Sequence, residues 1–154
     1  MLNYWPKYLT KLENYLKNRQ WQEANEETYL VMLQVADIEE GESIWEDDIG
    51  KFTCEDLLAI NDLWVKYSEG KFGFTVQRDI LLDCGGKIGE YEYESYKKFT
   101  EKVGWYERDK DECYRDLELS FDTINMGFLP FLYAPYYPGH VMVALFSRLQ
   151  SCDL

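Results

Sequence analysis

Histidine is nearly absent from this sequence. The chain has 154 residues and a single histidine, His140. A Ser–His–Asp or Cys–His nucleophilic site would have to use that residue, and no nucleophile motif such as G-x-S-x-G occurs beside it. Carboxylates are plentiful, but nothing in their spacing brings two of them together for acid–base catalysis. We therefore expect a protein that is not an enzyme, with His140 in a structural or surface position.

Cysteine pairs of the C-x-x-C type are also missing. The four cysteines are Cys54, Cys84, Cys113 and Cys152. Zinc sites commonly take their ligands from closely spaced pairs, so a zinc site is poorly supported. Scattered cysteines in a domain with ample apolar residues are typical of reduced thiols in a cytosol-like compartment. The sequence therefore predicts reduced thiols and no metal site.

Basic residues are scarce as well. Lys and Arg total 16 against 29 Asp and Glu, and the formal net charge is -13. Nucleic acids and anionic membranes both attract basic surfaces, so neither suits this chain as a partner. No apolar run approaches the roughly 20 residues of a membrane span, and the N-terminus lacks a basic leader followed by an apolar run. We expect one soluble domain over residues 1–154, with no integral membrane segment and no secretory signal.

Apolar side chains recur at helical spacing along much of the chain. Intervals of three and four residues, which mark one face of a helix, run through 7–18, 21–36, 57–67, 93–103 and 141–149. The first two segments are joined by a very short connection, so they should run antiparallel. Thr53 is placed to cap the N-terminus of the third segment, which ends near Gly70. These patterns predict an all-α protein.

Two stretches interrupt the helical spacing. Residues 37–52 are acidic and indicate a connecting loop with one short helical turn near 46–50. In residues 72–76 apolar and small side chains alternate, which favours a brief extended segment. A helix over 76–84 fits the same region equally well, and both interpretations stand at this point. The glycine pair at 85–86 then marks a turn.

The segment from 104 to 139 differs from the rest of the chain. It is dense in aromatic residues and holds three of the four prolines. Proline excludes one regular helix here, and so long a loop in a compact domain is usually functional or disordered. Its rings either cap the helical core or line a groove for a flat apolar ligand. Nearby Lys102, Arg108, Lys110 and Arg115 would meet the carboxylates of such a ligand.

The most specific run in the sequence is 63–77, LWVKYSEGKFGFTVQ. It resembles the signature of the Genomes Uncoupled 4 family, the porphyrin-binding proteins of oxygenic phototrophs that stimulate magnesium chelatase. The runs WQEANEETYLVMLQVA, DDIGKFTCEDLLAIND and LFSRLQSC are similar to that family too. The resemblance extends over residues 8–152.

The resemblance implies an all-helical domain shaped like a cupped hand, with a long aromatic-rich loop before the last helix. Residues 37–52 and 104–139 would form its apolar concave face. The implied ligand is protoporphyrin IX or Mg-protoporphyrin IX, with no cofactor required. The implied partner is the large porphyrin-binding subunit of magnesium chelatase. The implied location is the cytoplasm of a cyanobacterium or the stroma of a plastid.

Two features bear on which pigment is bound. The lack of a dedicated histidine ligand fits a carrier of metal-free porphyrin. Family members usually read G-H-L-P in the long loop, and this chain has Gly127, Phe128, Leu129 and Pro130 there. The alternatives are therefore a divergent paralogue that binds a bilin, or a protein-interaction module without pigment.

These considerations predict a ligand site on the long loop. Trp21 and Trp64 are expected in the core, and Phe72 and Phe74 either line the groove or belong to the core. The propionates would meet Arg108 and Arg115. The expected apolar contacts are Trp105, Ile124, Met126, Phe128, Leu129 and Phe131.

Overall fold

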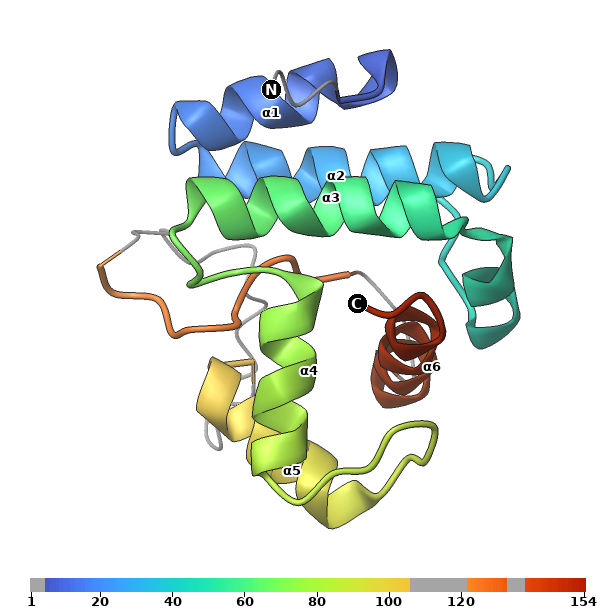
Figure 1. The fold of residues 1–154 in the computed structure, drawn as a ribbon, viewed down its shortest axis with the longest axis vertical. Helices are drawn as coiled ribbons and strands as arrows, with labels where there is room; N and C mark the ends of the chain where they lie inside the picture. The colour runs from blue at the N-terminus through green and yellow to red at the C-terminus, as the bar shows by residue number, and fades with distance from the viewer. Residues whose placement is uncertain (1–4, 106–121, 133–137) are drawn as a thin grey trace.

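The described part of this chain is built from helices. The computed structural model describes residues 5–105, 122–132 and 138–154 (Figure 1). Among these residues the structure has an isolated bridge between Lys87 and Glu90 but no strand, and no helix has the length and apolar character to cross a membrane. The all-α class predicted from the sequence is confirmed. In chain order the elements are the 3-10 helix η1 (Lys7–Leu9), α1 (Thr10–Lys17), α2 (Trp21–Val35), the 3-10 helix η2 (Glu46–Lys51), α3 (Cys54–Tyr67), α4 (Phe74–Asp83), α5 (Tyr93–Val103) and α6 (Pro138–Ser151).

Helices α1, α2 and α3 lie side by side, and α4, α5 and α6 lie on one side of this layer (Figure 1). The first two run antiparallel, as their short connection predicts, and Arg19 in that connection adopts a left-handed φ of 56°. Trp21 of α2 and Trp64 of α3 are buried and stack with ring centroids 6.3 Å apart. The Trp64 indole N–H donates to Thr28 Oγ1 over 2.9 Å. Both tryptophans are therefore core residues, as expected.

Local sequence sets the start of α3. The Asp56 N–H donates to Thr53 Oγ1 over 3.1 Å, and the Thr53 hydroxyl donates to the Asp56 carboxylate over 2.8 Å. This side-chain cap satisfies one of the N–H groups that a helix start leaves without a partner. The predicted N-cap at Thr53 is confirmed.

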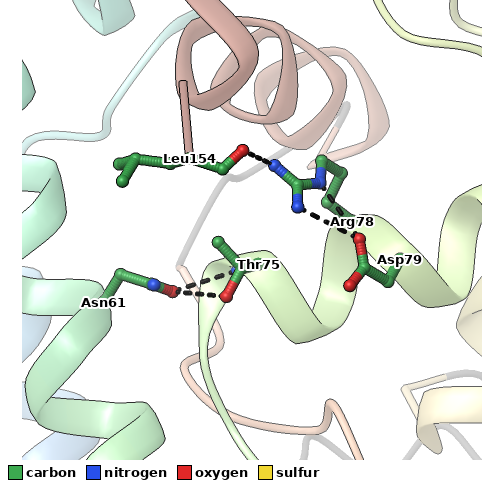
Figure 2. A network of polar contacts seen from close by, with 5 residues as sticks. All are labelled: Asn61, Thr75, Arg78, Asp79 and Leu154. Atoms are coloured by element: carbon green, nitrogen blue, oxygen red, sulfur yellow. Dashed lines mark hydrogen bonds and ion pairs between the residues drawn. The ribbon is translucent and has the colours of Figure 1, made fainter. Parts of the chain in front are cut away.

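The start of α4 depends on a residue from another helix. Phe74–Asp83 is helical, so the extended interpretation of residues 72–76 is wrong from Phe74 onward. Gly73 precedes the helix at φ 134°, and a Cβ there would lie 2.7 Å from Val65 Cγ2. Asn61 Oδ1 on α3 accepts from both the N–H and the hydroxyl of Thr75, at 3.0 and 3.2 Å (Figure 2). Asn61, which tertiary packing brings to this position, thus caps α4 and allows a helix from Phe74, where the alternation of side chains had favoured an extended segment.

Three contacts tie the C-terminal end of α6 to the rest of the fold. The Arg78 guanidinium on α4 donates to the Leu154 carbonyl oxygen and pairs with Asp79 over 3.1 Å (Figure 2). The Arg148 guanidinium donates to the Phe52 carbonyl oxygen over 3.0 Å. The third contact is a disulfide bond between Cys54 and Cys152.

That disulfide corrects a prediction. Cys54 begins α3 and Cys152 follows α6, with Cα atoms 5.5 Å apart and 98 residues of sequence between them. The expected reduced thiols are therefore wrong for these two residues. The packing of α6 against η2, which directly precedes α3, brings them together, and no sequence spacing records that packing. Cys84 is a free, half-buried cysteine, and Cys113 lies outside the described residues.

Candidate functional site

Residues 127–130 of the long loop are fixed to the start of α4. The Gly127 N–H donates to the Lys71 carbonyl oxygen over 2.8 Å, and the Gly73 N–H donates to the Leu129 carbonyl oxygen over 3.1 Å. The Gln77 amide is fully buried and donates to the carbonyl oxygens of Gly127 and Pro130, at 3.0 and 2.8 Å. These four hydrogen bonds hold this part of the loop against the core.

A second anchor joins the loop to α2 and to the end of α5. The buried Asn25 side chain accepts from the Phe131 N–H over 2.6 Å and donates to the Phe131 carbonyl oxygen over 3.1 Å. The Trp105 indole N–H donates to the Phe128 carbonyl oxygen over 2.8 Å. The rings of Trp105 and Phe131 meet edge to face, with centroids 4.8 Å apart. The structure thus gathers three of the residues predicted to bind ligand.

The predicted site residues differ in how accessible they are. Phe72, Phe74 and Leu129 are fully buried, and Phe128 is nearly so. For Phe72 and Phe74 the core interpretation is therefore the one that the structure supports. Trp105, Ile124 and Phe131 are half-buried at the edge of the core, and Met126 is 56% exposed. Arg108 and Arg115 lie outside the described residues.

A cleft lies elsewhere, between η2, the turn at 89–91 and α6. Its volume is about 720 Å³. Ile49 on η2 and Val143 on α6 supply buried apolar surface. The residues that give the cleft its character are Glu46, Ile49, Tyr91, His140, Val143 and Arg148.

Hydrogen bonds between neighbouring residues fix the start of η2, which forms one wall of the cleft. The Trp45 N–H donates to the Asp48 carboxylate over 2.9 Å, and Lys51 pairs with the same carboxylate over 2.8 Å. The hydrogen bond from Lys51 lowers the pKa of Asp48. Asp48 is occupied in this way, and among the described residues Glu46 and Asp47 are the carboxylates that line the cleft.

The wall formed by α6 carries the guanidinium of Arg148. Arg148 donates to the Phe52 carbonyl oxygen through Nε and Nη2 and to Ser151 Oγ through Nη1. A guanidinium has five N–H donors. These three bonds hold Arg148 in place, and two further N–H groups are left for an anionic group in the cleft.

The first turn of α6 brings two rings together at the other end of the cleft. His140 is exposed, and its ring centroid lies 4.3 Å from that of Tyr91 at an interplanar angle of 34°. Gly139 permits this approach, because a Cβ there would lie 2.3 Å from Tyr91 Cε2. Tyr91 in turn packs on buried Tyr96, with ring centroids 5.5 Å apart. Burial raises the pKa of Tyr96, whose hydroxyl has no hydrogen-bond partner among the described residues.

Sequence reasoning did not identify this cleft. The glycine pair at 85–86 indicated only a turn and residues 37–52 only a connecting loop, and His140 was expected in a structural or surface position. One signal was available on α6. The cleft-lining residues of that helix follow the spacing i, i+3, i+4, i+7, i+8 and i+11 from His140 to Ser151, a helical stripe that mixes polar and small apolar side chains. In residues 5–105, 122–132 and 138–154 no three His, Cys, Asp or Glu side chains are grouped to hold a metal ion.

Two known proteins are similar to this chain in sequence. A tetrapyrrole-binding protein from the chloroplast of Arabidopsis thaliana is 35% identical over 97 residues, which are 61% of this chain and 33% of that protein. The uncharacterized protein ycf53 of Pyropia yezoensis is 32% identical over 140 residues, 89% of this chain and 55% of that protein. This chain therefore spans between a third and about half of these two relatives.

Solved structures show the same fold. The ligand-free structure of Arabidopsis thaliana GUN4 superposes with a TM-score of 0.70 at 26% identity and covers 96% of both chains. GUN4 from Chlamydomonas reinhardtii also gives a TM-score of 0.70, at 19% identity, over 90% of this chain and 86% of that one. The model of the GUN4-like family matches residues 6–140. The resemblance found in the sequence is thereby confirmed, and this chain belongs to the GUN4-like family.

Proposed function

We propose that this chain is a non-catalytic tetrapyrrole-binding protein and that the cleft between η2 and α6 holds the pigment. The observation that carries the proposal is the cleft itself. Its volume of about 720 Å³ falls within the range of roughly 300–1,000 Å³ that is usual for small-molecule sites. Membership in the GUN4-like family, together with a relative named for tetrapyrrole binding, supports a tetrapyrrole as the occupant.

The lining of the cleft suits a flat ligand with an anionic edge. The apolar side chains of Ile49 and Val143, with the ring of Tyr91, would face the macrocycle. Burying about 300 Å² of apolar ligand surface would contribute roughly 7 kcal/mol before the cost of association. Arg148 would receive a propionate through its two remaining N–H groups, and charge-assisted hydrogen bonds of this kind are the stronger ones. Glu46 and Asp47 on the opposite wall disfavour a propionate there, so the ligand has a preferred orientation.

The finer identity follows from the resemblance. We propose protoporphyrin IX or Mg-protoporphyrin IX as the ligand, with a bilin as the alternative. We propose that the protein acts on magnesium chelatase through the large porphyrin-binding subunit, in cyanobacterial cytoplasm or plastid stroma. A second candidate location for the pigment is the long loop, where Met126 is exposed and Ile124 is half-buried and where Arg108 and Arg115 were expected to meet the propionates.

A titration with matched variants tests the ligand and its location together. Protoporphyrin IX is titrated into the purified protein, and its Soret absorbance and the tryptophan quenching are followed. Arg148→Gln removes the guanidinium from the cleft, and Arg78→Gln is its matched control. Both arginines hold a carbonyl oxygen near the end of α6, but only Arg148 lines the cleft. Met126→Ala and Phe128→Ala test the long loop.

The expected result is saturable binding that Arg148→Gln weakens by about tenfold or more, the scale of one charged hydrogen bond. Arg78→Gln should leave the affinity near that of the unmodified chain. Binding that responds to Met126→Ala and not to Arg148→Gln would move the pigment to the long loop. If protoporphyrin IX, its magnesium form and a bilin all fail to bind, the proposed function is wrong and a protein-interaction module takes its place.

The partner is tested separately. The purified large subunit of magnesium chelatase should co-elute with this chain in size-exclusion chromatography, and chelatase turnover should rise when the chain is added. Absence of both effects, with pigment binding intact, would keep the tetrapyrrole-binding function and remove the chelatase from it.

A further inference from the structure

The disulfide bond between Cys54 and Cys152 joins the two walls of the candidate cleft. Cys54 begins α3 soon after η2 ends, and Cys152 follows Ser151, which lines the cleft and is the last residue of α6. Helix α6 packs on η2, and residues of both elements line the cleft. The bond therefore limits how far these two walls separate at the end of the cleft that holds Arg148.

The same bond restrains the two groups that hold the Arg148 side chain. The Arg148 guanidinium donates to the Phe52 carbonyl oxygen over 3.0 Å and to Ser151 Oγ over 3.1 Å. Phe52 lies two residues before Cys54, and Ser151 lies directly before Cys152. An intact disulfide therefore keeps both hydrogen-bond acceptors close together, and in this way it fixes the guanidinium that the proposed function assigns to a propionate.

The disulfide lies within reach of a reductant. Cys54 and Cys152 are each half-buried, and the residues directly before and after each of them are exposed. Exposed disulfides are the labile ones and often have a regulatory role. In a cytosol-like compartment such as the one proposed above, thiols are kept reduced and a disulfide is usually transient. The position of this bond therefore suits reversible reduction better than a permanent structural role.

Helix α6 has other contacts that keep it in place when the bond is broken. The Arg78 guanidinium on α4 donates to the Leu154 carbonyl oxygen. Leu145 and Leu149 of α6 are fully buried in the core. We therefore expect the reduced chain to remain folded, while the two acceptors of Arg148 move apart more freely.

We propose that the bond between Cys54 and Cys152 is a redox switch on the cleft: the oxidised chain holds Arg148 in place for the pigment, and the reduced chain binds the pigment more weakly. This inference rests on the proposed function. The reductant is a dithiol, such as that of a C-x-x-C protein. One of its thiolates attacks a sulfur of the pair, and the other sulfur of the pair leaves and takes up a proton.

The second thiol of the reductant completes the exchange. It displaces the pair's remaining sulfur from the mixed disulfide and closes the reductant's own disulfide. Two electrons and two protons have then passed from the dithiol to the pair, and Cys54 and Cys152 are both thiols. The reverse exchange with an oxidised dithiol restores the bond, so the same residues serve both directions.

The size of the effect is limited by the contribution of Arg148. An apparent affinity falls in proportion to the fraction of molecules that have the binding geometry, and a site that is already ordered avoids this loss. Reduction therefore weakens binding by no more than Arg148→Gln does. We expect the reduced chain to bind protoporphyrin IX about fivefold more weakly than the oxidised chain.

The test titrates protoporphyrin IX into the full chain in oxidised or in reduced dithiothreitol, with circular dichroism to confirm that each sample is folded. The double variant Cys54→Ser with Cys152→Ser should bind like the reduced chain in both buffers. Its matched control is Cys84→Ser with Cys113→Ser, which keeps the disulfide pair and removes the other two cysteines. That control should keep the full difference between the two buffers.

A variant of Arg148 separates this route from a general loosening of the fold. In Arg148→Gln the guanidinium is already gone, so reduction should change the affinity by less than about twofold. In Arg78→Gln the full difference of about fivefold should remain. An undiminished effect of reduction in Arg148→Gln would overturn the inference, because the bond would then act on binding without Arg148.

The equilibrium between thiols and disulfide gives an independent readout. If the oxidised chain binds the pigment about fivefold more tightly, saturating protoporphyrin IX must favour the disulfide by the same factor. For this two-electron couple, that factor lowers the reduction midpoint by about 20 mV. The midpoint is measured in mixtures of reduced and oxidised dithiothreitol, with and without pigment, by thiol labelling. An unchanged midpoint would contradict the switch.

The outcomes distinguish this inference from the proposed function. If the oxidised and reduced chains bind the pigment equally, the switch is wrong and the tetrapyrrole-binding function stands. Tighter binding by the reduced chain would also overturn the inference. If neither form binds protoporphyrin IX, its magnesium form or a bilin, the proposed function fails and the switch fails with it.

Discussion

Removing the disulfide between Cys54 and Cys152 should lower the stability of this protein substantially. The bond closes a loop with a sequence separation of 98 residues. In the chain-entropy model, a closed loop of about 100 residues stabilises a fold by roughly 4.7 kcal/mol, and loss of a native disulfide typically costs about 2–5 kcal/mol. We expect the pair Cys54→Ser and Cys152→Ser to lower the free energy of unfolding by about 3–5 kcal/mol.

The loss of stability should arise mainly because the unfolded chain without the disulfide has more conformational freedom. Arg148 holds the Phe52 carbonyl oxygen and Arg78 holds the Leu154 carbonyl oxygen, so the native position of α6 does not depend on the sulfur–sulfur bond alone. The uncrosslinked chain gains freedom when it unfolds, and its unfolded state exposes more surface. The m-value in urea should therefore rise as the midpoint falls.

Urea denaturation followed by far-ultraviolet circular dichroism measures this prediction. The unmodified chain is compared with and without dithiothreitol, and reduction should reproduce the effect of the double substitution. Cys84→Ser is the control, because Cys84 is not in the disulfide, and dithiothreitol should still destabilise that variant. For a chain of this length, a loss of about 4 kcal/mol corresponds to a fall in Tm of roughly 10 °C.

Two results would refute the reasoning. Thiol counting in denaturant without reductant should find at most two reactive cysteines, and four would show that the bond does not form. A bond that forms but whose reduction leaves the midpoint unchanged would show that its constraint on the unfolded chain is negligible.

Two further predictions concern side-chain hydrogen bonds, one buried and one partly buried. Thr28→Val removes the oxygen that accepts from the Trp64 indole over 2.9 Å, and leaving that buried N–H without a partner should cost about 1–3 kcal/mol in urea denaturation; Thr28→Ser keeps the hydroxyl and should retain most of the stability. Burial and then a hydrogen bond to Glu13 raise the pKa of Tyr67 from 10.0 to about 12. Between pH 10 and 12 the Tyr67 hydroxyl therefore stays protonated in the folded state and loses its proton in the unfolded state. The stabilisation that Tyr67 gives to the folded state is fully present below pH 10 and is lost as the pH rises towards 12. Stability measured across that window should fall less steeply in Tyr67→Phe, and equal slopes would contradict the shift.

Much of the helical fold could be predicted because its causes are local. The segment predicted at 21–36 is found as Trp21–Val35, and that at 93–103 as Tyr93–Val103. Amphipathic spacing records which face a helix buries, and Thr53 records where α3 begins. The start of α4 was ambiguous because its cap, Asn61, comes from another helix.

The candidate site could be predicted only in part. The dense rings of residues 104–139 were a visible signal, but rings serve a core as well as a groove. Asn25 and Gln77 decide the matter for Phe128 and Leu129, since they fix the backbone around them and leave both side chains buried. Neither polar residue shows in the sequence that it is reserved for a loop 50 or more positions away.

The sequence by itself determined the helical class, the main helices, the core tryptophans and the family, because periodicity, caps and specific runs of residues are properties of neighbouring positions. Tertiary structure alone decided the disulfide, the anchoring of the long loop and the cleft. Each of these joins groups from distant parts of the chain: Cys54 with Cys152, Asn25 with Phe131, and η2 with α6. Such pairings are selected by the packing of whole helices, which minimises exposed apolar surface over the entire fold, and no local pattern encodes the result.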